Sequence, residues 1–376
     1  MIYLDHNATT PIDERVVEAM RPYQTQFFGN PSSLHKLGRL SRGAIDQARE
    51  QVAALVGAKP CQVIFTSGGT EANNLAIKGL AASFPSVRLA FGATEHPSVS
   101  EAVAAARRFG ATCSTLAVNE DGQIRSEALE EWASGQGGLV SVMLANNETG
   151  VVQDLAPVVE RARRSQAAVH TDAVQAAGKI AVDFESLGVQ LMSLSGHKIG
   201  GPKGVGALIT DQTVHLEPLL HGGGQEQGLR GGTENVAAIV GFGKAAELAR
   251  AELTDRASHV AGLRSLLEDR LSRIPGITLF ARSQRRLPNT LQIAAEGVDG
   301  EMLVMLLDRA GIAVSSGSAC ASGGGEPSPV LTAMGVPASL AKSAVRISLG
   351  SSNSEAHVDA LVTALKQILQ PQSSVA

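Results

Sequence analysis

Apolar runs alternate with amphipathic stretches along the first part of the chain. The apolar runs are rich in Val, Ile, Leu and Phe, and they predict strands at residues 63–65, 87–91, 139–144, 167–170, 191–194 and 205–209. Apolar residues at helical spacing predict helices at residues 71–82, 99–109, 125–132 and 156–164. Strands that are apolar throughout are typical of a sheet buried on both faces. The pattern therefore predicts an α/β fold, with a mostly parallel sheet covered by helices on both faces.

The pattern changes towards the carboxyl terminus. A long helical pattern runs from residue 234 to about residue 274 and stops before Pro275-Gly276. It is followed by strand-like runs at residues 289–294 and 345–349 and by helical stretches at residues 300–309 and from 355 onward. A loop rich in Ser and Gly lies at residues 315–325. This texture predicts a second, smaller α+β domain that is joined to the first through the long helix.

Charge and composition favour small-molecule chemistry. The 376 residues include 32 basic and 36 acidic side chains, for a net charge of −4, and neither sign forms a long block. We therefore expect neither nucleic acid nor an anionic membrane surface as a partner. The 40 glycines indicate many tight loops and close backbone approaches.

The three cysteines, Cys61, Cys113 and Cys320, match no metal-binding spacing and no disulfide framework. Cys61 and Cys113 lie beside or within apolar runs, and we expect both to be structural. The amino terminus lacks the basic and apolar regions of a signal peptide, and no apolar run approaches about eighteen residues. The sequence thus predicts a soluble protein of the reducing cytoplasm.

A glycine-rich segment at residues 66–71 (TSGGTE) joins a predicted strand to a predicted helix. Free backbone N–H groups and the positive end of the helix could hold a phosphate there. The alternative is an ordinary turn in which Thr70 caps the helix. The segment matches neither the Walker loop nor the GxGxxG pattern, so it carries little weight alone.

Lys198 and Asp172 also follow predicted strands, at the edge where open α/β sheets bind ligands. A lysine there can form a Schiff base, and a carboxylate can pair with a pyridinium nitrogen; both are what pyridoxal phosphate requires. The alternatives are a lysine in a surface loop and a helix cap at Asp172. Most of the other lysines, of nine in all, occur in patterns typical of solvated side chains.

Two more polar segments follow predicted strands, at residues 146–150 (NNETG) and 94–97 (TEHP). His96 could stack on a planar ring or move protons, because imidazole titrates near neutral pH. The alternative is a turn residue before proline. Since several strand ends carry polar groups, we expect these groups to share one site.

Taken together, these segments resemble the cysteine desulfurases of the NifS and IscS type, which are pyridoxal-phosphate enzymes of fold type I in the class V aminotransferase group. The motifs that carry the resemblance are residues 3–11 (YLDHNATTP), 29–33 (GNPSS), 67–74, 95–97, 146–150, 170–175, 195–198, 230–235 and 315–320. The resemblance implies a large cofactor-binding domain, residues 13–255, with a mostly parallel seven-stranded sheet between helices. Residues 1–12 and 256–376 would form the smaller α+β domain, which carries the cysteine loop.

The resemblance also implies which residues hold pyridoxal 5′-phosphate. Lys198 would bind the cofactor covalently, Asp172 would pair with the pyridine nitrogen, and Gln175 would bond the ring hydroxyl. His96 would stack over the ring and take part in catalysis. The phosphate would be held by Gly69, Thr70, Ser195, His197 and, from the second subunit of a homodimer, Thr233.

Asn147, which also borders the cofactor, and Arg346 would hold the carboxylate of the substrate, L-cysteine, because a guanidinium fork suits a carboxylate. Cys320 lies in a polar, glycine-rich loop that we expect to be mobile. Its thiolate would take sulfur from L-cysteine, leaving L-alanine and a persulfide on Cys320. The persulfide would supply an iron–sulfur scaffold or another acceptor protein. The one metal contact expected is a transient iron–sulfur ligand role of Cys320.

Other functions remain open at this point. A selenocysteine lyase or a class V aminotransferase would use the same cofactor, although an aminotransferase needs no cysteine on a loop. A non-catalytic sulfur-relay or scaffold protein would not need Lys198, Asp172, His96 and Gln175 together. The chain ends soon after residues 369–371 (LQP), without the longer tail of housekeeping IscS-type members, which favours a NifS-like role such as nitrogenase maturation.

Overall fold

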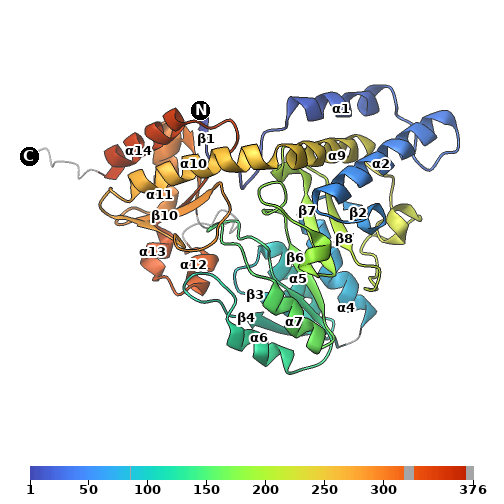
Figure 1. Ribbon diagram of the computed structural model, residues 1–376. Coiled ribbons are helices and arrows are strands. Elements are labelled where there is room, and N and C mark those ends of the chain that lie inside the picture. Colours follow the sequence, from blue (N-terminus) through green and yellow to red (C-terminus); the bar gives the residue numbers. More distant parts are fainter. Residues whose placement is uncertain (85, 317–325, 370–376) are drawn as a thin grey trace, which may run out of the picture.

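The computed structural model describes residues 1–84, 86–316 and 326–369. Its central sheet has seven strands in the order β2-β8-β7-β6-β5-β3-β4 (Figure 1). The strands are β2 (Val63–Thr66), β3 (Arg88–Gly92), β4 (Thr112–Leu116), β5 (Leu139–Ser141), β6 (Ala168–Asp172), β7 (Leu191–Ser195) and β8 (Gly206–Thr210). Only β8 pairs antiparallel, with β7 and with β2; the other pairs are parallel. The predicted α/β fold with a mostly parallel sheet is confirmed.

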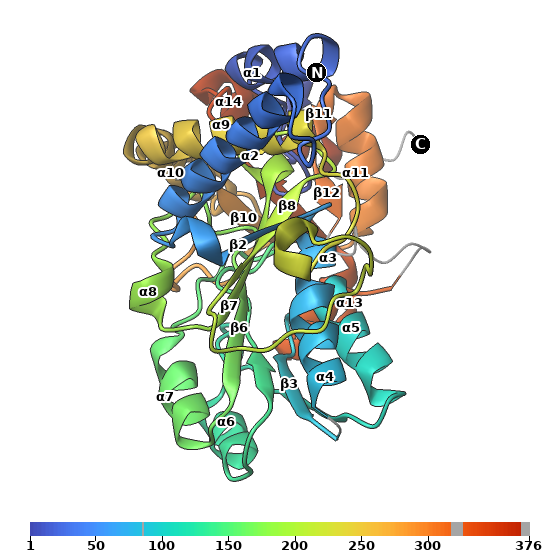
Figure 2. The same cartoon turned by 90° about the vertical axis from the view of Figure 1, so that its right-hand side faces the viewer.

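Helices cover both faces of this sheet, because successive side chains of a strand point to opposite faces. In β2, Val63 and Phe65 join the hydrophobic cluster under α2 (Lys36–Leu55) and α9 (Val236–Ala251). Ile64, between them, joins the cluster under α3 (Gly69–Asn74) and α5 (Pro97–Arg107). Figure 2 shows α4 (Leu80–Ser83) and α5 on one side of β6 and β7, and α7 (Ala156–Arg164) on the other.

The remaining helices of this part are α1 (Glu14–Thr25), α6 (Ser126–Ala133) and α8 (Phe184–Leu187). The long helix predicted at residues 234–274 is wrong as a single element, because α9 ends at Ala251 and α10 (Leu253–Leu271) follows. Glu252 between them has φ −104° and ψ 9°. Its carboxylate accepts hydrogen bonds from Arg15 of α1, over 2.6 Å, and from Arg256 of α10, over 2.8 Å. These contacts hold the chain at the break.

A smaller antiparallel sheet has the strand order β12-β13-β10-β9. Its strands are β9 (Ile277–Leu279), β10 (Thr290–Ala295), β12 (Ser315–Ser316) and β13 (Ala344–Ser348). Near the amino terminus, β1 (Ile2–Tyr3) pairs in parallel with β11 (Ile312–Ala313). Besides α10, the helices of this part are α11 (Gly300–Arg309), α12 (Pro329–Ala333), α13 (Ala338–Lys342) and α14 (Glu355–Leu369).

This second part has its own hydrophobic cluster. Leu4 from the amino terminus packs there with Leu267 of α10, Ile293 of β10 and Leu361 of α14. A separate cluster contains the buried side chains of α2 and α9. We propose on this basis that residues 13–255 form the large domain, and that residues 1–12 and 256–376 form the small one. None of the helices in the described ranges combines the length and apolarity that a membrane span requires.

Candidate active site

A cavity of about 310 Å³ opens at the carboxyl ends of the parallel strands. The segments after β2, β3, β5, β6 and β7 contribute to its lining, because parallel strands bring their carboxyl ends to one edge of the sheet. The residues expected from the sequence that line it are Gly69, Thr70, His96, Asn147, Asp172, Gln175, Ser195, His197, Lys198 and Arg346. Segments far apart in the sequence thus meet around one space.

One end of the cavity is suited to a phosphate. Gly69 begins α3 directly after the turn that follows β2, so the positive end of the helix faces this region. The hydroxyl oxygen of Ser195 is buried and has no hydrogen-bond partner within the described ranges. A Cβ atom at Gly69 would lie 2.8 Å from Cγ2 of Val174, so a side chain would crowd the site. An orphaned hydroxyl beside a helix start leaves a place for a phosphate oxygen.

His197 lies beside the same region, with Nδ1 3.1 Å from the hydroxyl oxygen of Thr9. Burial, assisted by the nearby charges of Lys198 and two other lysines, lowers the pKa of His197 to about 4. The ring is therefore neutral at pH 7 and can act as a hydrogen-bond donor or acceptor.

Asp172, at the end of β6, is buried but held by two donors. The side-chain amide of Asn73 donates to Oδ2 over 2.7 Å, and the backbone N–H of Val174 donates to Oδ1 over 3.0 Å. The same amide nitrogen of Asn73 donates to the hydroxyl of Ser98 over 2.8 Å. The carboxylate is thus fixed in orientation at the cavity wall.

His96 caps α5, followed by Pro97 in the first turn of the helix. Its Nδ1 accepts from the backbone N–H of Ser98 over 3.1 Å and lies 2.8 Å from the hydroxyl oxygen of that residue. Burial is the main cause that lowers the pKa of His96; the carboxylate of Asp172 opposes it and the ammonium of Lys198 adds to it. With Nδ1 accepting, a neutral ring carries its proton on Nε2.

Lys198 ends a short 3-10 turn, Gly196–Lys198, directly after β7. Its ammonium donates to the carbonyl oxygens of Asn7 and Ala8, over 2.6 and 2.7 Å. The side-chain amide of Gln175 donates to the same carbonyl oxygen of Asn7 over 3.0 Å. The amino-terminal segment therefore crosses the site and holds Lys198 and Gln175 against one backbone oxygen.

Arg346 reaches the cavity from β13, in the smaller sheet. It is buried, with Nη2 donating to Oδ1 of Asp5 over 2.7 Å and Nη1 donating to the carbonyl oxygen of Asn147 over 3.2 Å. Its Nε has no partner in the part of the chain that the structure describes. The guanidinium thus places a buried positive charge opposite the strand ends.

Two of the site residues expected from the sequence, Thr233 and Cys320, are not found at this cavity in the described part of the chain. Thr233 is exposed and does not line the cavity. Cys320 and its loop, residues 317–325, lie outside the described residues, so the expected mobility of that loop stays a prediction. The flanking strand β12 pairs with β13, with Ser315 opposite Arg346. Cys61 is exposed, contrary to a packed structural role, whereas Cys113 is partly buried.

Sequence reasoning assigned no role to Asn7, Asn73, Ser98 or Lys179. Asn7, Asn73 and Ser98 line the cavity, and Lys179 contacts Gln175. Asn7 and Asn73 lie inside recognised motifs, but their role depends on contacts across the fold. The sequence does not single out Lys179 among the other lysines, and its Nζ donates hydrogen bonds to Asn7 and Gln175. No group of three or more His, Cys, Asp or Glu in the described ranges is placed to hold a metal ion.

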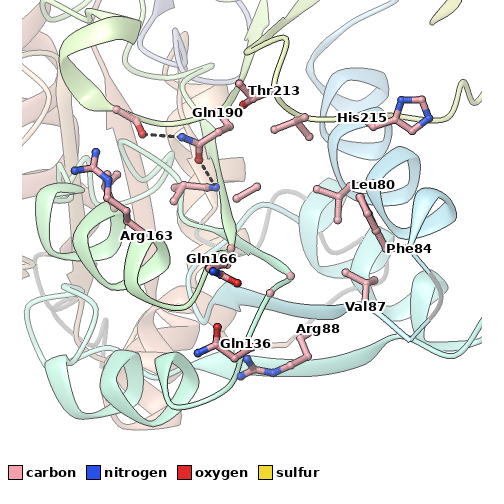
Figure 3. A pocket seen from close by; sticks show the side chains of 18 of the residues that line it. Leu80, Phe84, Val87, Arg88, Gln136, Arg163, Gln166, Gln190, Thr213 and His215 are labelled. Atoms are coloured by element: carbon pink, nitrogen blue, oxygen red, sulfur yellow. Dashed lines mark hydrogen bonds between the residues drawn. The ribbon is translucent and has the colours of Figure 1, made fainter.

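A larger cavity, of about 670 Å³, lies at the opposite, amino ends of the parallel strands (Figure 3). Its lining includes Arg88 and Gln190, and none of the residues expected from the sequence. Gln190 accepts from the backbone N–H of Val169 over 2.9 Å and donates to the carbonyl oxygen of Gly188 over 3.1 Å. Arg88 packs over the ring of Trp132 and donates to its carbonyl oxygen. Gln190 and Arg88 thus use their polar groups for hydrogen bonds to the backbone of the fold.

Comparisons with known proteins identify the family of this chain. Residues 2–361 match the family described as aminotransferase class-V. The chain belongs to this family. Cysteine desulfurase IscS of Methanosarcina thermophila is 42% identical over 371 residues, covering 98% of this chain and 92% of the relative.

Solved structures extend the match. A NifS-like protein has a TM-score of 0.91 and 37% identity, covering 98% of this chain and 99% of the other. The structure titled "SspA in complex with cysteine" has a TM-score of 0.83 and 32% identity, covering 94% of this chain and 100% of the other. Within this family, the chain belongs to the cysteine desulfurases.

Proposed function

We propose that this enzyme uses pyridoxal 5′-phosphate to take sulfur from L-cysteine, and that it releases L-alanine and keeps the sulfur as a persulfide on Cys320. The observation that carries the proposal is the position of Lys198 and Asp172 at the ends of the adjacent strands β7 and β6, in one cavity that Arg346 enters from the second sheet. A lysine, a fixed carboxylate and a buried guanidinium are the groups that an amino acid and this cofactor require.

The residues present fit the cofactor. The orphaned hydroxyl of Ser195 and the start of α3 suit its phosphate, with Gly69, Thr70 and His197 beside them and Thr233 supplied by the second subunit of a homodimer. Lys198 would hold its aldehyde carbon, Asp172 its pyridine nitrogen and Gln175 its ring hydroxyl, while His96 would cover the ring. When bound, pyridoxal phosphate supplies a sink for the electrons released at the substrate α-carbon.

Arg346 and Asn147 would orient the substrate carboxylate. Nη1 and Nη2 of Arg346 are held by Asn147 and Asp5, and its buried Nε has no partner in the described chain. A guanidinium fixed in this way offers a preformed, charge-assisted partner to an α-carboxylate. Binding of the carboxylate at this position would then orient the Cβ–S bond of L-cysteine.

Lys198 and His96 would move the protons. The amine of Lys198, which now donates to the carbonyl oxygens of Asn7 and Ala8, would accept the α-proton once the substrate amine has taken its place. His96 presents a neutral ring whose Nδ1 is engaged by Ser98, which leaves the proton on Nε2 for exchange with the substrate or with a thiol.

The sulfur step would need no outside oxidant. The thiolate of Cys320 attacks the sulfur of L-cysteine, so that an S–S bond forms as the Cβ–S bond breaks, and the electron pair of that bond stays with carbon. The transferred sulfur keeps its own proton as S–SH. The proton that Cys320 gives up on forming its thiolate balances the one that completes the methyl group of L-alanine. Sulfur is oxidised, and the substrate carbon is reduced by the same two electrons.

The persulfide would then be handed to an iron–sulfur scaffold or to another acceptor protein. The class of the relatives supports this destination. A cytoplasmic setting fits it, because the free thiol of Cys320 persists where disulfides are kept reduced. Cys320 would ligate a cluster only transiently, during hand-over. Supply of sulfur to nitrogenase is the narrower form of the same role.

The test uses the purified full chain. It should be yellow, borohydride should fix the pyridoxyl group to Lys198, and L-cysteine should give L-alanine without any keto acid. Cys320→Ser should keep the colour and lose alanine release. Equal alanine release by Cys320→Ser would overturn the nucleophile assignment, and dependence on a keto acid would indicate an aminotransferase instead.

A further inference from the structure

Lys179 is an interior lysine next to the site. It follows Gln175 by four residues and is partly buried. Its Nζ donates to Oε1 of Gln175 over 2.6 Å and to Oδ1 of Asn7 over 2.8 Å. Burial lowers the pKa of Lys179 well below its ordinary value, and the charges of Lys198 and Arg346 act in the same direction. Nζ carries N–H donors in either protonation state, so both hydrogen bonds persist.

The side chain of Gln175 ends in a carboxamide, whose donor end and acceptor end are of nearly equal size. Such a group can face either way, so it needs a partner that fixes its orientation. Its oxygen is turned toward Lys179, and its Nε2 donates to the carbonyl oxygen of Asn7 over 3.0 Å, at the cavity wall. That carbonyl oxygen also accepts from Lys198. A bound group with an acceptor oxygen would compete with that carbonyl oxygen for Nε2, whereas Oε1 already accepts from Lys179, which does not line the cavity.

We propose that Lys179 is a positioning residue, which holds the oxygen of Gln175 back so that the NH2 group faces the ring hydroxyl oxygen of pyridoxal phosphate. The inference rests on the proposed function. The ring hydroxyl is readily ionised and then accepts hydrogen bonds only, so a donor must face it. With the carboxamide reversed, two acceptor oxygens would oppose each other at a cost comparable to a buried, unmade hydrogen bond.

The alternative explanation is that Lys179 acts on the cofactor only through its charge. The charged and titratable groups that face it are Lys198, His197 and Arg346 from the cavity, and His6 from the amino-terminal segment. A charge acts on an anionic cofactor whether or not Gln175 is present. The positioning role acts through Gln175 alone, so a double-mutant cycle separates the two.

The experiment prepares the full chain without cofactor and titrates it with pyridoxal phosphate, following absorbance, for wild type, Lys179→Met, Gln175→Ala and the double variant. We expect Lys179→Met to weaken binding about tenfold and to shift the absorption band of the bound cofactor. In the Gln175→Ala background the same change should cost at most about twofold. An equal loss in both backgrounds would overturn the proposal.

Two further variants keep the result interpretable. Lys179→Gln retains N–H donors without the charge, so it should bind the cofactor nearly as wild type does; a loss as large as that of Lys179→Met would count against positioning. Lys203→Met removes an exposed lysine whose charge is felt at His197, without touching Gln175, and should leave the affinity within about twofold. Failure of wild type to bind pyridoxal phosphate would instead refute the proposed function.

Discussion

Asn73 donates a hydrogen bond of 2.7 Å to the carboxylate of Asp172, joining the first helix after β2 to the end of β6. The two residues are 99 positions apart in the sequence. The contact fixes one carboxylate oxygen, and the backbone N–H of Val174 fixes the other. An oriented carboxylate is what a pyridinium nitrogen requires, so Asn73 supports the proposed cofactor site through Asp172.

The first prediction concerns this support. Asn73→Leu keeps the side-chain volume but removes the donor, and it should weaken pyridoxal phosphate binding about tenfold to a hundredfold, because hydrogen bonds to charged groups are among the stronger ones. Absorbance titration of the cofactor-free protein measures this. Asn74→Leu is the matched control, since its amide donates to the backbone carbonyl oxygens of Thr70 and Ser98 and not to Asp172. Wild-type affinity in Asn73→Leu would contradict the prediction.

The second prediction concerns the substrate carboxylate. Arg346→Lys keeps the charge but loses the planar fork, and it should raise KM for L-cysteine at least about tenfold while the absorption of the bound cofactor stays unchanged. Steady-state alanine release measures KM. Arg273→Lys is the control, because Arg273 is exposed and pairs with Asp269 on the surface. An unchanged KM in Arg346→Lys would remove Arg346 from the substrate site.

The third prediction concerns pH and stability. Glu148 is buried and accepts hydrogen bonds from Ser328 over 2.6 Å and from Gln292 over 3.1 Å. Burial raises its pKa to about 7 from an ordinary value of 4.5, so the folded state holds a proton that the unfolded state has lost. Its contribution to stability is therefore complete below pH 4.5 and is lost as pH rises to about 7, a change of about 3 kcal/mol.

Glu148→Gln removes that titration and tests it. Relative to wild type, the variant should gain up to about 3 kcal/mol in free energy of unfolding between pH 5 and pH 8, as measured by denaturant titration. The comparison with wild type cancels the opposite trend of His6 and His170, whose pKa values burial lowers to about 4 and which destabilise the fold as pH falls below 6.5. A constant difference between the two proteins would refute the prediction.

The fourth prediction concerns packing behind the site. A Cβ atom at Gly350 would lie 2.2 Å from Cε1 of His6, and the His6 ring is buried and cannot swing aside freely. Gly350→Ala should lower the free energy of unfolding by about 1–3 kcal/mol. His6→Ala in the same chain should recover part of the loss. Gly262→Ala, in α10 with open space around it, is the control and should be neutral or stabilising.

Some helix and strand limits could not be read from local pattern. The polar edge strand β4 (Thr112–Leu116) has an exposed, polar face, which apolar runs do not reveal, and it is typical of sheet edges. Glu252, at the break between α9 and α10, accepts a hydrogen bond from Arg15, a residue 237 positions away. Periodicity carries no information about such a partner.

The sequence by itself determined the α/β class and the edge of the sheet where chemistry gathers. Buried parallel strands must be apolar, and their carboxyl ends must share one edge, so polar segments that follow apolar runs converge there, as Asp172 and Lys198 do. Only the tertiary structure decided which groups hold them. Asn7 meets Lys179 and Thr290, and Arg346 meets Asp5, across 172 to 341 positions. Hydrogen-bond partners so distant are chosen by the packing of whole elements, which local spacing does not encode.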